Sequence, residues 1–164
     1  NTFLIGGGGF AYPKFYVHTY ENAEITVSEI NTDVISVAFQ YFGLHDLSED
    51  ETKRMHIVNE DGIEYLRESN KKFDLIINDA FTGKKEQRRD EESIQIIHDA
   101  LNEKGIYIVN VPTALSGPFA KKGNAFRKLL QNHFKHTVLL ATQEEKQPFE
   151  KQNVLMISSD SELL

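Results

Sequence analysis

Four consecutive glycines follow the apolar run at residues 2–5 and precede a helix-like stretch that opens at Pro13. Glycine lets backbone N–H groups approach a ligand that a Cβ atom would push away, and the start of a helix adds donors and a positive dipole. Pro13 suits a first helical turn because its fixed φ matches that position. A tight turn alone needs fewer glycines, so we interpret the run as a nucleotide-binding loop made of Gly6, Gly7, Gly8 and Gly9.

An acidic residue, Glu29, stands 20 positions after Gly9 and follows the second strand-like run. Gly6, Gly8 and Ala11 fit the dinucleotide-binding pattern G-x-G-x-x-[GA], in which an acidic residue further on accepts the ribose hydroxyls. Nicotinamide cofactors and S-adenosylmethionine both present such a ribose, so the pattern alone leaves the cofactor open. The alternative role for Glu29 is to cap the helix that follows it.

Two more carboxylates follow the ends of strand-like runs. Asp61 lies in Asn59-Glu60-Asp61-Gly62, which opens a helix, and Asp79 ends the run at residues 74–78. Asp61 can accept the exocyclic amine of adenine while backbone N–H groups near Gly62 meet a ring nitrogen, or it can simply cap the helix. Ligands of open α/β sheets bind at the carboxyl ends of strands, where three carboxylates would favour a cation such as a sulfonium with an amine acceptor.

The elements that must position these residues alternate along the chain. We predict strands at residues 2–5, 24–28, 55–58, 74–78, 106–111, 137–141 and 154–158, and helices at residues 13–20, 33–42, 62–68, 91–101 and 120–133. Thr32 and Asp90 are expected to cap the second and fourth helices, and Gly105 to end the fourth. Continuous apolar blocks such as Leu75-Ile76-Ile77 are typical of parallel strands that are covered on both faces.

The loop at residues 143–152 contains Pro148 and has no helical periodicity, so the last two strands should form an antiparallel hairpin. We therefore predict an α/β fold, a three-layer sandwich around a seven-stranded, mostly parallel Rossmann-like sheet that ends in this hairpin. That is the plan of the class I methyltransferase sheet, an analogy of fold alone.

Composition excludes several other classes. The chain has 164 residues, a net charge of −7 and no Cys, which rules out disulfides and thiolate metal sites. No apolar run approaches the roughly 20 residues of a membrane span, and no basic face indicates a nucleic-acid partner. The six His residues show no metal-binding spacing. We expect a cytoplasmic protein whose residues 1–164 form one domain that lacks an upstream N-terminal segment.

Four motifs then occur together in a specific order and spacing: Ile5-Gly6-Gly7-Gly8, Val27-Ser28-Glu29-Ile30, Glu60-Asp61-Gly62-Ile63-Glu64-Tyr65-Leu66 and Phe73-Asp74-Leu75-Ile76-Ile77-Asn78-Asp79. Over nearly its whole length the chain resembles the spermidine synthase-like family, a branch of the methyltransferase fold. The resemblance implies that Glu29 holds the ribose, Asp61 the adenine, and Asp79 the region of the transferred group. It also implies S-adenosylmethionine or its decarboxylated form as cofactor and a small-molecule amine as acceptor.

Two positions depart from that family. Aminopropyltransferases carry Asp where this chain has Gly9, and a second Asp where it has Thr82. Without such a base an ammonium stays protonated near neutral pH and cannot attack. We therefore expect a transferase that moves a methyl group rather than an aminopropyl group, with Asp79 orienting or deprotonating the amine.

Three alternatives remain at this stage. One is an aminopropyltransferase that tolerates the loss of these two acids. Another is a degenerate, non-catalytic nucleoside-binding domain, which would explain the missing acids equally well. An NAD-dependent oxidoreductase fits the glycines and Glu29 but leaves Asp61 and Asp79 without a role. No nucleic acid or membrane partner is expected, and an apolar patch uncovered by the absent upstream segment would favour a homodimer.

Overall fold

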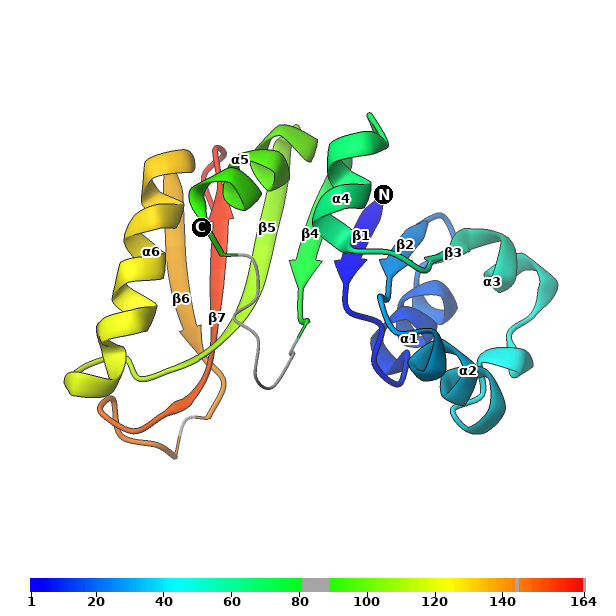
Figure 1. Ribbon diagram of the computed structural model, residues 1–164, viewed down its shortest axis with the longest axis horizontal. Coiled ribbons are helices and arrows are strands. Elements are labelled where there is room, and N and C mark those ends of the chain that lie inside the picture. The colour runs from blue at the N-terminus through cyan, green and yellow to red at the C-terminus, as the bar shows by residue number, and fades with distance from the viewer. Residues whose placement is uncertain (81–88, 144, 164) are drawn as a thin grey trace.

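Seven strands form one sheet in the order β3-β2-β1-β4-β5-β7-β6 (Figure 1). They are β1 (Thr2–Ile5), β2 (Ile25–Ser28), β3 (Met55–Val58), β4 (Phe73–Asn78), β5 (Leu101–Thr113), β6 (His136–Ala141) and β7 (Gln152–Ser159). The first five strands pair in parallel, and β7 pairs antiparallel with both β5 and β6. The computed structural model describes residues 1–80, 89–143 and 145–163. The predicted mostly parallel sheet with its C-terminal antiparallel hairpin is confirmed.

Helices cover both faces of the sheet and complete the predicted three layers (Figure 1). One face carries α4 (Gly62–Glu68), α5 (Glu91–Ala100) and α6 (Lys121–His133), whose buried residues share one core cluster with β1, β4, β5 and β7. Helices α1 (Ala11–Thr19) and α2 (Thr32–Tyr41), together with a short 3-10 helix at Leu44–Asp46, form a second cluster with β1, β2 and β3. Helix α3 (Glu49–Arg54) precedes β3.

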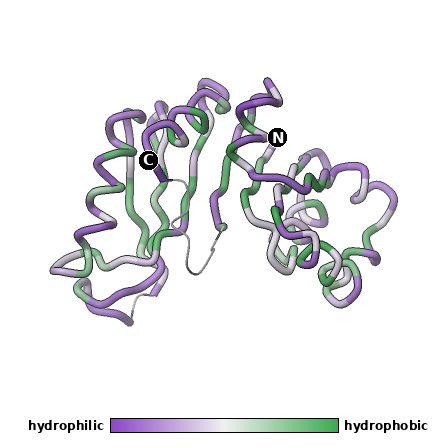
Figure 2. Tube along the Cα trace, viewed as in Figure 1, coloured by the Kyte–Doolittle hydropathy of each residue, from purple (hydrophilic) through white to green (hydrophobic). Residues whose placement is uncertain are grey.

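The alternation of side chains along the strands separates the two clusters. Phe3 and Ile76 belong to the α4–α6 side, whereas Leu4 and Val27 belong to the α1–α2 side, and all four are nearly inaccessible to solvent. Burial of each such side chain stabilises the fold by roughly 1.5–3 kcal/mol. Figure 2 shows the same pattern, with apolar residues concentrated along the strands and polar residues on the outer turns of α6. This packing holds the carboxyl ends of the strands at a fixed spacing.

Several predicted boundaries need correction. Helix α1 begins at Ala11 rather than at Pro13, after Phe10 adopts a left-handed backbone with φ 55°. The cap of α2 is Asn31, whose side chain accepts the N–H of Asp33, so the prediction of Thr32 was wrong. Thr32 instead donates its hydroxyl to the Asn59 side chain.

The fourth predicted helix, α5, starts as expected and ends differently. Asp90 caps it by accepting the N–H of Ser93, which confirms that prediction. The helix ends at Ala100, because Leu101 is already extended and pairs with Phe73 in β4. Gly105 therefore lies inside β5 and does not end the helix.

Helix α3 was not predicted. It begins with a capping box in which Ser48 and Glu51 exchange hydrogen bonds between side chain and backbone.

Among the residues that the structure describes, no helix is both long and apolar enough to cross a membrane.

Candidate active site

The glycine segment is held between the ends of β2 and β4. The Gly6 N–H donates to the Ser28 carbonyl at 2.8 Å, and the Asp79 N–H donates to the Ile5 carbonyl at 3.1 Å. Gly6 has a φ of 96°, and a Cβ atom there would lie 2.9 Å from the Cα atom of Ala80. Only glycine permits this close approach. The segment therefore lies at the point where the strand order reverses between β1 and β4, where open α/β sheets bind their ligands.

Glu29 is tied to the glycine segment directly. Its Oε2 atom accepts the N–H groups of Gly7 at 3.0 Å and Gly8 at 3.3 Å, and its Oε1 atom accepts the Asn31 N–H at 2.9 Å. The residue is only 9% exposed. A carboxylate offers about four acceptor positions, so these three bonds leave about one for a ligand hydroxyl. Glu29 thus shapes the predicted loop, while capping of α2 is done by Asn31.

Asp61 caps α4, the alternative considered for it. Its Oδ1 atom accepts the N–H groups of Ile63 at 2.9 Å and Glu64 at 3.3 Å. Within the described part of the chain its Oδ2 atom has no hydrogen-bond partner, which leaves this oxygen for a ligand donor. Gly62 lets the start of α4 approach the sheet, because a Cβ atom there would lie 2.9 Å from the Ile5 side chain.

Asp79 is the most accessible of the three carboxylates. Its Oδ1 atom accepts an N–H from the Asn110 side chain at 3.0 Å, and Oδ2 has no partner among the described residues. Beneath it, Asn78 donates to the hydroxyl of Tyr107 at 3.3 Å. Burial raises the pKa of Tyr107 to about 12 against the opposing effect of the Asn78 hydrogen bond, so the phenol is neutral at physiological pH. Thr82 lies outside the described residues.

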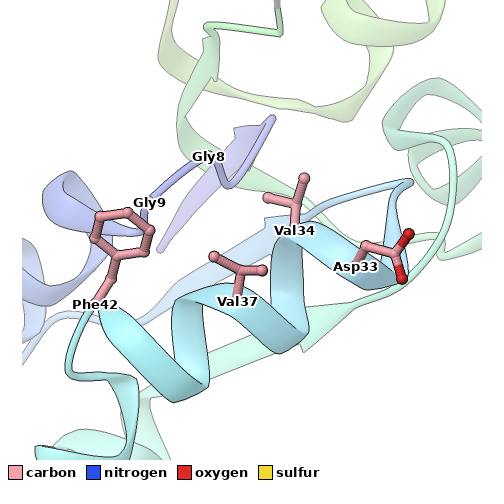
Figure 3. A pocket seen from close by; sticks show the side chains of 6 residues that line it. All are labelled: Gly8, Gly9, Asp33, Val34, Val37 and Phe42. Carbon is pink, nitrogen blue, oxygen red and sulfur yellow. The ribbon is translucent and has the colours of Figure 1, made fainter.

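A groove of about 300 Å³ adjoins the glycine segment on the side of α2 (Figure 3). Figure 3 shows Val34 and Val37 rising from α2 toward the glycines, with Phe42 beside Gly9. A Cβ atom on Gly9 would lie 3.8 Å from the Phe42 ring, so position 9 faces an apolar wall. Glu29, Asp61 and Asp79 do not line this groove. The carboxylates predicted to attract the sulfonium and the groove beside α2 both adjoin the glycine segment at this edge of the sheet.

Sequence reasoning assigned no role to Asn110 or Phe42. Asn110 is identified only by the strand register in the structure, in which Asn78 pairs with Val109 and the residues that follow them are Asp79 and Asn110. Phe42 has no signal in the sequence, since it follows α2 and reaches the glycines only through the turn after that helix. Across the described ranges, no three His, Asp or Glu side chains gather in a way that could hold a metal ion.

Solved structures share the fold at low sequence identity. The match to a probable spermidine synthase from Corynebacterium glutamicum covers 99% of this chain and 57% of the synthase chain, with a TM-score of 0.82 and 19% identity. A spermidine synthase in complex with the transition state analogue AdoDATO has a TM-score of 0.77 at 22% identity, covering 98% of this chain and 54% of its own. Human methyltransferase-like protein 13 in complex with SAH has a TM-score of 0.76 at 19% identity, covering 96% and 70%.

Comparison at the level of sequence identifies the family. The polyamine aminopropyltransferase of Pyrococcus abyssi is 30% identical over 112 residues, which are 64% of this chain and 40% of the relative. That of Hydrogenobaculum is 29% identical over 110 residues, 66% of this chain and 39% of the relative. The matched segment thus spans about two fifths of these relatives. The spermine/spermidine synthase domain matches residues 2–116, and the chain therefore belongs to the spermine/spermidine synthase family.

Proposed function

We propose that this domain binds S-adenosylmethionine, or its decarboxylated form, at the carboxyl ends of β1 to β4 and transfers a methyl or aminopropyl group to an amine. One observation carries the proposal. Three carboxylates follow β3, β2 and β4, the strands on either side of β1 and its glycine segment, and Asp61 and Asp79 each keep one oxygen without a partner among the described residues. Such an edge attracts a cationic ligand and a cationic acceptor together.

The residues present fit an adenosyl ligand. Gly8 has a φ of 50° and open space where its Cβ atom would stand, so a ligand can approach the backbone there. The remaining acceptor position of Glu29 suits one ribose hydroxyl, and Oδ2 of Asp61 suits the exocyclic amine of adenine. When bound, the sulfonium supplies an electrophilic carbon and a neutral thioether leaving group.

Asp79 is assigned to the acceptor amine. Its Oδ2 atom, which has no partner among the described residues, accepts a hydrogen from the nitrogen and aims the nitrogen lone pair along the line of displacement. As the nitrogen–carbon bond forms and the carbon–sulfur bond breaks, the proton released by nitrogen passes to Asp79 or to water. The protein's contribution is therefore orientation and charge.

A methyl group fits the site better than an aminopropyl group. Position 9 faces the Phe42 ring, and Val34 and Val37 continue this apolar wall. Among the described residues that line the groove, the one carboxylate is Asp33, which lies in the first turn of α2 at the other end of the helix from Phe42 (Figure 3), so an ammonium at position 9 has no anionic partner beside it. An unpaired ammonium beside such a wall would lose hydration without compensation. The side chain of Thr82, the other changed position, carries no charge.

Calorimetry tests the cofactor directly. The chain is titrated with S-adenosylmethionine, decarboxylated S-adenosylmethionine, methylthioadenosine and NADH. We expect S-adenosylmethionine to bind more tightly than the decarboxylated form. The reverse order would restore aminopropyl transfer, binding of NADH alone would indicate an oxidoreductase, and no binding of any sulfur nucleoside would overturn the proposal.

A second candidate is a non-catalytic nucleoside-binding domain. The three backbone N–H groups already bonded to Glu29 favour it, because this carboxylate has a structural role without any ligand. That candidate predicts S-adenosylmethionine binding with no transfer to any amine in a panel of mono-, di- and polyamines. Detection of a methylated or aminopropylated product by mass spectrometry excludes it.

The homodimer also stays a prediction, which sedimentation of the purified chain would test.

A further inference from the structure

Asn110 is the β5 residue that stands next to Asp79. It continues the register in which Asn78 pairs with Val109, and its Nδ2 atom donates to Oδ1 of Asp79 at 3.0 Å. Its backbone is anchored independently. The Asn110 carbonyl accepts an N–H from Arg89 at 3.0 Å, and Asn110 is paired with Leu155 of β7. The amide therefore approaches Asp79 from a rigid base.

The other end of the Asn110 amide is unsatisfied. Its Oδ1 atom is buried and has no hydrogen-bond partner among the described residues. A buried acceptor without a partner destabilises a fold, and an apolar side chain of similar size avoids that cost. Leu155 stands opposite in β7, so an apolar residue would also have a neighbour to pack against. Stability alone does not explain an asparagine here.

The orientation of the amide explains it. If the amide were flipped, its oxygen would face the carboxylate of Asp79 and repel it, so the NH₂ group points at Asp79 and the oxygen points inward. One carboxylate oxygen is then occupied, and the other, Oδ2, has no partner among the described residues of this exposed side chain. We propose that Asn110 is a positioning residue that fixes Asp79 so that Oδ2 receives the acceptor amine. This inference rests on the function proposed above.

The chain contains a matched control pair on the same two strands. Asn102 of β5 donates its side-chain N–H to Oδ1 of Asp74 in β4, at the end of the sheet opposite the glycine segment. The residue types and the kind of bond are the same as for Asn110 and Asp79. The pairs differ in two further respects: the other oxygen of Asp74 accepts the N-terminal ammonium of Asn1 at 2.7 Å, and Asn102 is exposed. The pair at Asp74 is therefore a control for the contact and for turnover, not for stability.

Nuclear magnetic resonance tests the contact without any activity. In uniformly ¹⁵N-labelled protein, Asp79→Ala should shift the side-chain amide signals of Asn110 and leave those of Asn102 in place, while Asp74→Ala should do the opposite. An Asn110 signal that does not respond to Asp79→Ala overturns the proposal.

Urea unfolding and turnover then separate positioning from structure. Asn110→Leu should leave the unfolding midpoint unchanged or raise it, while lowering kcat about 100-fold with unaltered S-adenosylmethionine affinity. Asn102→Leu should leave kcat unchanged, and Asn110→Leu should have no further effect on kcat when combined with Asp79→Asn. A lower midpoint for Asn110→Leu, or an equal kcat loss in both leucine variants, overturns the proposal. If the wild type transfers nothing, the proposed function fails while the resonance and unfolding results still decide whether Asn110 fixes Asp79.

Discussion

The carboxylates after β2 and β3 accept hydrogen bonds from backbone N–H groups, whereas the carboxylate after β4 accepts one from a side chain. Glu29 and Asp61 each hold at least two main-chain donors, and both therefore help to build the loops around them. Among the described residues, the Asp79 side chain contacts only the Asn110 amide through a hydrogen bond. The proposed cofactor side of the site is thus part of the fold, while the proposed acceptor side is added to a fold that is already complete. Substitutions on the two sides should separate accordingly.

The largest effect is expected from Asp79→Asn. Loss of the carboxylate should lower transfer to the amine by about 10²–10⁴-fold, the usual contribution of a positioned acid or base. The free energy of unfolding should change by less than about 0.5 kcal/mol, because the side chain is exposed. Turnover and urea unfolding are measured on the same preparations, with Asp74→Asn as the control for turnover. Unchanged turnover would remove Asp79 from the mechanism.

Glu29→Gln should affect both properties. An amide NH₂ would face at least one of the three N–H donors, so the free energy of unfolding should fall by about 1–3 kcal/mol. Affinity for S-adenosylmethionine should fall as well. Glu24→Gln, at an exposed position before the same strand, is the control for a change of charge. A Glu29→Gln variant as stable as the wild type would contradict the claim that the Glu29 hydrogen bonds stabilise the fold.

Asp61 allows the two roles to be divided at one position. Asp61→Ala removes the cap of α4 and should cost about 1 kcal/mol, whereas Asp61→Asn retains a good cap and should cost almost nothing. Both variants should weaken adenosyl binding in calorimetry, because neither keeps a full carboxylate for the adenine amine. Wild-type affinity in Asp61→Asn would show that this residue serves the helix alone.

The smallest effect concerns Glu51, a carboxylate bonded to backbone far from the site. Hydrogen bonds with the side chain and backbone of Ser48, and then with His18, lower the pKa of Glu51 from 4.5 to about 2. Since the folded pKa is depressed, its stabilisation is present above pH 4.5 and disappears as the pH falls to about 2. Unfolding midpoints of wild type and Glu51→Gln should therefore converge over that range. A difference between the two unfolding midpoints that stays constant over this pH range would contradict the lowered pKa of Glu51.

Much of the sheet could be predicted because its strands are short and continuously apolar. Leu75-Ile76-Ile77 identifies β4 without any tertiary information. The start of β5 could not be identified, since residues 102–104 are polar and exposed and are extended only because Leu101 pairs with Phe73. Adjacent Asn31 and Thr32 are both good caps, and the sequence alone does not decide between them.

The candidate site divides in the same way. Spacing after the glycines was enough to single out Glu29, but its hydrogen bonds to the loop join residues 21 and 22 positions apart and depend on the loop conformation. The sequence allowed two roles for Asp61, a cap of the following helix and an acceptor for the adenine amine, and the structure shows the capping hydrogen bonds. The contact between Asp79 and Asn110 requires the register of two strands, which local pattern does not specify.

The pairing of β1 with β4 has a consequence for the order of folding. Thr2 of β1 pairs with Leu75 of β4, so the strand that leads into the glycine segment is joined to its neighbour by residues 73 positions apart. The entropy lost in closing a loop grows with its length, and chains dominated by distant pairings fold slowly. We expect the ligand-binding edge to form late, after the local β1–α1–β2 unit and the β6–β7 hairpin. During synthesis the glycine segment leaves the ribosome before β4, and we expect it to reach its folded geometry only after β4 has followed.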